Sequence, residues 1–130
     1  MNLLLDTHAL IWWLEDSPQL GNAARRAIKA IENTCVISVV SAWEIAIKTA
    51  VGRLTLNLDP DESIPELFLL GFQPLSIQFR HAFTVRHLPL HHADPFDRML
   101  LAQAQCEGMT LVTADERFAA YGVPALDATK

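Results

Sequence analysis

The chain has 130 residues, of which 51% are hydrophobic, enough for one domain with a buried core and no disulfides. Cys35 and Cys106 lie in apolar segments outside any CxxC pair, and no export signal or run of about 18 apolar residues is visible. This pattern predicts buried thiols in the cytoplasm and excludes a disulfide-rich secreted scaffold and a membrane span. The net charge of −5 argues against tight nucleic-acid binding, because phosphate contacts need lysine and arginine.

The first half of the chain alternates short apolar runs with helical patterns. In chain order it predicts a strand at 3–5, helices at 7–14 and 23–31, a strand at 35–37 and a helix at 40–50. Ala24, Ile28 and Ile31 share helical spacing and should form one buried face. Gly52 ends the last of these helices, and residues 54–58 fit a short extended piece.

The second half continues the same alternation. It predicts a helix at 61–70, a strand at 72–75, a helix at 77–86, a loop at 89–93, a helix at 94–107, a strand at 109–113, a short helix at 116–120 and a strand at 123–126. The helix that begins at Asp94 has the strongest signals, because Pro95 follows an Asp cap and Gly108 ends the pattern.

Alternating strands and helices indicate an α/β fold with a central parallel sheet covered by helices on both faces. We expect right-handed crossovers and a single domain over residues 1–130. In open sheets of this kind, ligand sites form beyond the carboxyl ends of the strands. This rule directs attention to the residues that follow each strand.

Acidic residues from four segments are expected at that edge of the sheet. Asp6 ends the first strand, and Asp115 lies two residues beyond the strand at 109–113. Glu44 lies early in the helix after the second strand, and Asp97 is in the first turn of a later helix. If the strands are parallel, all four carboxylates meet at one edge.

Crowded carboxylates repel one another, so they either take up protons at raised pKa values or share a cation. Oxygen ligands alone suit Mg²⁺ or Mn²⁺. Such a centre activates water and stabilises charge on a phosphodiester oxygen, in a one-metal or two-metal arrangement. The pattern therefore predicts phosphodiester hydrolysis.

Each acid also has a simpler explanation. Those at helix starts fit capping roles: Asp6, Asp94, Asp97 and Asp115. Glu44 follows Ser41 at capping-box spacing, and it also fits an exposed ion pair with Lys48 one turn later. No single acid decides the matter, and the prediction depends on all of them lying at the same sheet edge.

One stretch concentrates positive charge and predicts a local basic patch: Arg80, His81, Arg86, His87, His91, His92 and Arg98. His91 and His92 precede the Asp94 cap and are candidates for contact with substrate phosphate. A metal role is not expected for them, because HxxxH spacing is absent. For His8, the sequence is equally consistent with a position at the site and with a position on the solvated surface.

Three tryptophans also require an interpretation. Trp12, Trp13 and Trp43 lie in helical patterns. We expect core packing or a dimer surface for them rather than a platform for stacked bases.

Four segments, in order, resemble the motifs of PIN-domain proteins, most of all the VapC-type toxins of prokaryotic toxin–antitoxin systems. They are LLLDTHAL at 3–10, SVVSAWEI at 38–45, HADPFDRMLLAQA at 92–104 and LVTAD at 111–115. The resemblance covers nearly the whole chain. It implies a PIN-like α/β/α sandwich and a Mg²⁺- or Mn²⁺-dependent endoribonuclease that cleaves RNA. It also implies a homodimer, and a higher assembly with a cognate VapB-type antitoxin.

The family's four acidic positions match Asp6, Glu44, Asp97 and Asp115, which the resemblance makes catalytic and metal-binding. It favours Asp6 and Asp97 as direct ligands, and Glu44 as a ligand or as the base that orients the attacking water. Asp115 would be a ligand or a hydrogen-bond acceptor behind the ligands. Asp94 is an extra acid of the DPFDR subgroup that either assists the metal or caps the helix.

The resemblance also assigns supporting residues. Thr7, Ser41 and Thr113 match small hydroxyl positions that hold the carboxylates. Arg98, beside Asp97, would bind a phosphate or form a surface ion pair.

Three other interpretations remain. A haloacid-dehalogenase-like phosphatase needs an acid two residues after its strand-end Asp, where this chain has His8. A non-catalytic binding module, whose acids only cap helices, predicts no metal-dependent activity and no perturbed pKa in the cluster. A housekeeping PIN nuclease for RNA processing would have the same site but no antitoxin.

Overall fold

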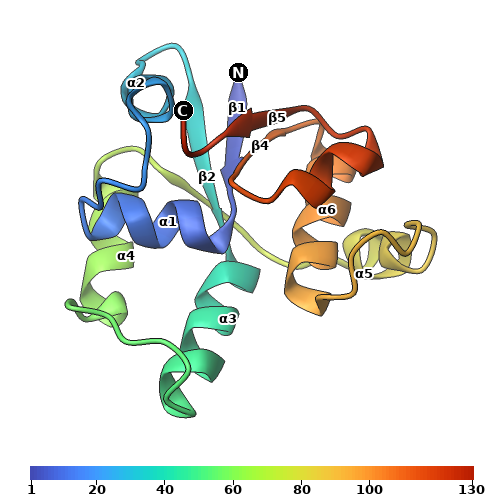
Figure 1. Ribbon diagram of the computed structural model, residues 1–130, viewed down its shortest axis with the longest axis horizontal. Coiled ribbons are helices and arrows are strands. Elements are labelled where there is room, and N and C mark those ends of the chain that lie inside the picture. The colour runs from blue at the N-terminus through green and yellow to red at the C-terminus, as the bar shows by residue number, and fades with distance from the viewer.

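The computed structural model describes all 130 residues and contains a single five-stranded sheet with helices on both faces (Figure 1). All neighbouring strands are parallel, in the order β3-β2-β1-β4-β5. Their bounds are β1 (Asn2–Leu5), β2 (Thr34–Ser38), β3 (Gln73–Leu75), β4 (Thr110–Thr113) and β5 (Ala125–Asp127). The predicted α/β/α architecture with a central parallel sheet is confirmed.

The helices follow the predicted order. They are α1 (Thr7–Leu14), α2 (Asn22–Lys29), α3 (Val39–Ala50), α4 (Pro60–Leu69), α5 (Phe79–Val85), α6 (Pro95–Glu107) and the 3₁₀ helix η1 (Glu116–Tyr121). Residues 54–58 form neither helix nor strand. None of the helices has the length and apolar character that a membrane crossing needs.

The core lies on both faces of the sheet because side chains alternate along each strand. Leu3 and Leu5 of β1 pack with apolar residues of α1, α2 and α4 on one face. Leu4, between them, faces the other layer and packs with the apolar side of α6. The three leucines are fully buried, as expected for a central strand covered on both sides (Figure 1).

Two details of the helices correct the sequence predictions. The N-cap of α3 is Ser38, whose Oγ accepts the backbone N–H of Val40 at 3.0 Å, so Ser41 lies inside the helix and the expected capping box with Glu44 is absent. Helix α2 ends at Lys29, and Ile31 beyond it is fully exposed rather than part of the buried face.

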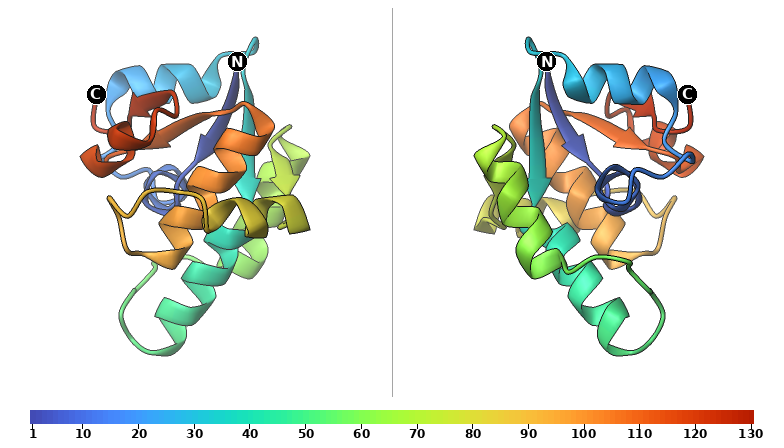
Figure 2. Two further views of the ribbon diagram at one scale, coloured as in Figure 1. Left: turned by 90° about the vertical axis from the view of Figure 1, so that its right-hand side faces the viewer. Right: turned by 90° about the vertical axis from the view of Figure 1, so that its left-hand side faces the viewer.

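The sheet topology selects one place for a site. From the central strand β1 the chain first adds β2 and β3 on one side and later adds β4 and β5 on the other. Connections therefore diverge at the carboxyl ends of β1 and β4, which is where ligands bind in open parallel sheets. Asp6 directly follows β1, and Asp115 lies two residues beyond β4. Helix α3 projects past this edge, with the start of α6 beside it (Figures 1 and 2).

Candidate metal centre

Asp6 connects β1 to α1 and is almost completely buried. Its backbone N–H continues the sheet by donating to Val112 at 3.0 Å, and its Oδ1 accepts the N–H of Ala9 at 2.8 Å, which caps α1. Burial raises the pKa of Asp6 and the charge of Glu44 adds to the rise, against hydrogen bonds from Thr113 and Ala9 that lower it. One oxygen of Asp6 therefore does cap α1, as the capping interpretation expects. The burial of the carboxylate, however, disfavours its charged form.

Glu44 is held inside the protein, with only 3% of its surface exposed. Its Oε1 accepts the hydroxyl of Thr7 at 2.6 Å, and its Oε2 pairs with Lys48 one turn along α3. The hydroxyl oxygen of Ser41 lies 3.2 Å from that of Thr7. The ion pair with Lys48 exists, but it joins a partly exposed lysine to a buried carboxylate instead of lying on an exposed face. A role as an exposed surface charge therefore does not explain why Glu44 is buried.

Asp97 lies in the first turn of α6, whose N-cap Asp94 accepts the Asp97 backbone N–H at 3.0 Å. The pKa of the Asp97 carboxyl is raised to about 7, chiefly by burial. The charges of neighbouring carboxylates add to the rise: Asp94, Glu44, Asp6 and Asp115. The fold thus brings acids from four separate segments within electrostatic range of Asp97.

Asp115 follows β4 and caps η1, accepting the Arg117 backbone N–H at 2.9 Å. The guanidinium of Arg117 also lies 2.7 Å from Asp115 Oδ2. This partner lowers the pKa of Asp115 to about 2. The hydroxyl oxygen of Thr113 accepts the Asp115 backbone N–H at 3.0 Å, so Thr113 connects Asp115 with Asp6.

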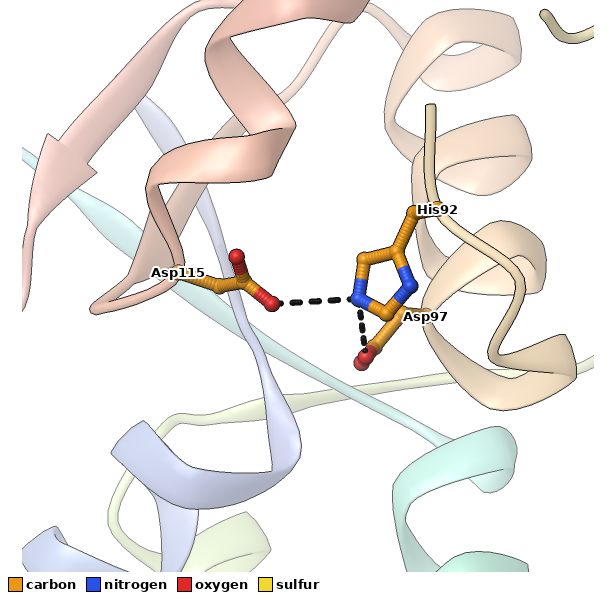
Figure 3. Close-up of side chains that lie close together, drawn as sticks. All are labelled: His92, Asp97 and Asp115. Carbon is orange, nitrogen blue, oxygen red and sulfur yellow. Dashed lines mark hydrogen bonds and ion pairs between the residues drawn. The ribbon is translucent and has the colours of Figure 1, made fainter. Parts of the chain in front are cut away.

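From the sequence, His92 was a candidate for contact with substrate phosphate, and the structure places its ring against two of the carboxylates (Figure 3). It lies in the loop before α6 and is 4% exposed. Its Nε2 lies 3.0 Å from Asp115 Oδ2 and 2.8 Å from Asp97 Oδ2. Potential ligand atoms of these three residues all lie within 4.8 Å of one another. HxxxH spacing does not reveal this position, because the carboxylates that contact the histidine come from other elements.

Arg98 corrects a second prediction. Its side chain is buried rather than exposed, and it binds no carboxylate. The guanidinium donates to main-chain carbonyls of the preceding segment: Val85 at 2.9 Å, Leu88 at 3.1 Å, Pro89 at 2.8 Å and His92 at 3.3 Å. Neither a phosphate contact nor a surface ion pair fits these contacts, and Arg98 instead fixes the loop that carries His92.

The predicted basic patch is also wrong. His81, His92 and Arg98 are buried, and Arg80 pairs with Glu107. The other members, at positions 86, 87 and 91, remain exposed. The sequence neighbours therefore do not form a common surface.

The tryptophans divide between core and surface. Trp12 and Trp13 pack against the core from α1. Trp43 is 53% exposed and meets Phe96 edge-on, with 5.1 Å between ring centroids.

The donor set fits a hard divalent cation. Carboxylate oxygens of Asp6, Glu44, Asp97 and Asp115 gather at the edge where β1 and β4 end, while the neighbouring cations Lys48 and Arg117 each pair with one acid. Oxygen ligands of this kind are those that Mg²⁺ and Mn²⁺ prefer. The repulsion seen at Asp97 is the condition that a bound cation relieves.

Known proteins resemble this chain in sequence or in fold. The chain is 30% identical over 123 residues to Ribonuclease VapC22 of Mycobacterium tuberculosis, covering 94% of this chain and 93% of that protein. The structure of VapBC2 from Rickettsia felis, bound to a DNA fragment from their promoter, matches with a TM-score of 0.73 and 17% identity over 98% of both chains. A toxin-antitoxin complex from Klebsiella pneumoniae matches with a TM-score of 0.63 and 22% identity over 97% of both chains.

The two solved structures are below 25% identity, so they bear on the fold. The family assignment depends on the sequence. Residues 3–124 match the model of the PIN domain, a span that includes all four carboxylates of the cluster. This chain is a member of the PIN-domain family.

Proposed function

We propose that this protein is an endoribonuclease that depends on Mg²⁺ or Mn²⁺, held at the cluster of Asp6, Glu44, Asp97 and Asp115. The observation that carries the proposal is the state of Asp97, whose pKa of about 7 reflects burial among four other carboxylates. A cation in the cluster would remove this repulsion. A helix cap alone does not account for such a shift, so the non-catalytic module is disfavoured. The relative named Ribonuclease VapC22 supports RNA as the substrate.

The residues divide the work as follows. Asp6 and Asp97 would bind the cation directly, and Asp115 would complete the ligand set. A divalent cation supplies charge stabilisation for the phosphodiester and a water of lowered pKa. Glu44, oriented by Thr7 and Lys48, accepts a proton from the attacking water as general base.

Asp94 keeps its role as the cap of α6 and adds negative charge near the ligands. The hydroxyls of Ser41 and Thr113 orient their neighbours in the cluster. Arg98 has no part in substrate binding.

The test is cleavage of a labelled RNA by the purified protein. We expect EDTA to stop cleavage and Mn²⁺ or Mg²⁺ to restore it. Asp6→Asn and Asp97→Asn should each reduce the rate by about 100-fold or more. Asp61→Asn, which changes an exposed acid on α4, is the matched control and should cleave normally. Cleavage that persists in EDTA, or two fully active cluster variants, would refute the proposal.

We further propose that the protein is the toxin of a toxin–antitoxin pair, acting in the cytoplasm as a homodimer that a VapB-type antitoxin neutralises. The named relatives support this: one is a VapC ribonuclease, and another is a toxin-antitoxin complex. Expression of this chain alone should arrest growth, and coexpression of a small neighbouring gene should restore it. The housekeeping alternative predicts no arrest and no such neighbour.

A further inference from the structure

We propose that His92 is a positioning residue of the metal centre. Its Nε2–H holds the carboxylates of Asp97 and Asp115 side by side, and this nitrogen faces them as a hydrogen-bond donor. His92 therefore orients two ligands without itself becoming one. The inference rests on the proposed function, since it assumes that the carboxylate cluster binds a divalent cation.

The first argument is the position of the ring. Asp97 and Asp115 come from different elements, the start of α6 and the segment after β4, and Nε2 of His92 approaches an oxygen of each at 2.8 and 3.0 Å (Figure 3). A buried imidazole needs one partner for each ring nitrogen, and the fully buried His81 places a single carboxylate, that of Glu107, at its Nε2. At His92, one nitrogen bridges two carboxylates that would otherwise repel each other.

The second argument is the tautomer of the ring. The backbone N–H of Asp94 donates to Nδ1 of His92 at 3.2 Å. A backbone N–H is a donor only, so Nδ1 carries the lone pair and the ring proton is on Nε2. The nitrogen that faces the carboxylates is therefore a donor. A metal ligand would need a lone pair at that atom.

The third argument is that the ring is fixed independently of the carboxylates. The backbone N–H of His92 donates to the Tyr121 hydroxyl at 2.8 Å, and its carbonyl accepts from Arg98 at 3.3 Å. The imidazole ring packs against the ring of Phe118, with 5.7 Å between the ring centroids. His92 is thus held from several sides, which suits a group that determines where other side chains lie.

Hydrogen-bond donors behind ligating carboxylates orient them, and their loss typically costs 10–100-fold in metal affinity. Two substitutions distinguish the hydrogen-bonding roles of the two ring nitrogens of His92. The amide nitrogen of glutamine reaches the Nε2 position and still donates to the carboxylates. The amide of asparagine reaches only the Nδ1 position, where it accepts from Asp94 and leaves the carboxylates without a donor.

The experiment measures Mg²⁺ dissociation constants by calorimetry. We expect His92→Asn to bind about 10–100-fold more weakly than the wild type, and His92→Gln to remain within a few-fold of it. His91→Asn, at the exposed neighbouring position, is the control and should bind normally. Unchanged affinity in His92→Asn, or an equal loss in both His92 variants, would overturn the inference.

A second measurement needs no variant of unknown stability. The ¹⁵N chemical shifts of the wild-type imidazole report which nitrogen carries the proton. We expect His92 to remain the Nε2–H tautomer before and after Mg²⁺ is added. Loss of that proton on metal binding would make His92 a ligand and overturn the inference.

Failure of the proposed function would look different. If the wild type binds no Mg²⁺, or if Asp97→Asn binds it equally well, the metal centre itself is wrong and the role of His92 falls with it. If binding depends on Asp97 but not on the donor at position 92, only the role of His92 is wrong.

Discussion

The surroundings of single acidic residues in this centre shift their pKa values strongly. Asp97 shares its surroundings with four other acids, and its pKa of about 7 lies well above the ordinary value of 3.8. Asp115 has the opposite condition, because Arg117 lowers its pKa to about 2. Two carboxylates that approach the same histidine nitrogen thus differ widely in how readily they ionise. Without a cation, the ionised carboxylate of Asp97 opposes folding.

The first prediction concerns the stability of Asp97→Asn without metal. Because the folded-state pKa of Asp97 is raised, its ionisation costs folding free energy. The cost is absent below about pH 4, grows as the pH rises to about 7, and is then constant. We expect the variant to be more stable than the wild type by about 1–2 kcal/mol at pH 8, since solvent screens part of the repulsion. The gain should shrink toward pH 5.

Urea unfolding in EDTA at the two pH values measures this difference. Added Mg²⁺ should then stabilise the wild type and leave the variant nearly unchanged. A variant less stable than the wild type at pH 8 would show that Asp97 is not strained in the folded protein.

Residues at strand ends could be placed from the sequence, whereas the positions of His92 and Arg98 were not predicted. The carboxyl ends of parallel strands share one edge, so the positions of Asp6 and Asp115 followed from recognising β1 and β4. His92 lies in a loop without periodicity, and its partners are distant in sequence. Arg98 did carry a usable signal. It precedes the fully buried Leu101 and Ala102 by three and four residues, on the same helical face.

Among the elements, α6 and the loop before it organise one side of the site. Asp94 caps the helix, Asp97 lies in its first turn, and Arg98 reaches back to the carbonyls of residues 85, 88, 89 and 92. The loop therefore has few ways to move relative to the helix. His92 takes its place near Asp115 because Arg98 fixes the backbone that carries it.

The second prediction tests this anchor. Arg98→Met keeps much of the side-chain volume but removes every donor, leaving several carbonyls without their partner. We expect a loss of about 2–3 kcal/mol in unfolding free energy. Faster hydrogen exchange should be confined mainly to residues 85–93. Arg86→Met changes an exposed arginine in the same segment and should stay within about 0.5 kcal/mol of the wild type. Equal effects of the two substitutions would contradict the anchoring role.

Element boundaries were predictable where a residue fixes the backbone and less so elsewhere. Asp94, Pro95 and Gly108 set both ends of α6, and Gly108 has the positive φ of 66° that favours glycine. The start of α3 was predicted within one residue, but its N-cap was not, because Ser38 and Ser41 both suit that position and only the end of β2 decides between them. Because Ser38 is the N-cap, Ser41 and Glu44 lie inside the helix on its buried face.

At the scale of the whole molecule, the sheet topology brings the acidic residues together at one site. Each acid alone can be explained as a cap or an ion-pair partner, and several do have that role. The strand order places the ends of β1 and β4 side by side, and α3 and α6 begin near the same edge. Alternating sequence patterns predict such a sheet, but they do not specify which strands are neighbours. The central position of β1 therefore had to come from the structure.

These carboxylates are proposed to hold one cation site. A crystal soaked in Mn²⁺, with anomalous differences measured near the manganese absorption edge, tests this. We expect a peak within ligand distance of Asp97 and Asp6, with His92 outside ligand distance. No peak at this edge of the sheet, or a peak only elsewhere on the protein, would contradict it.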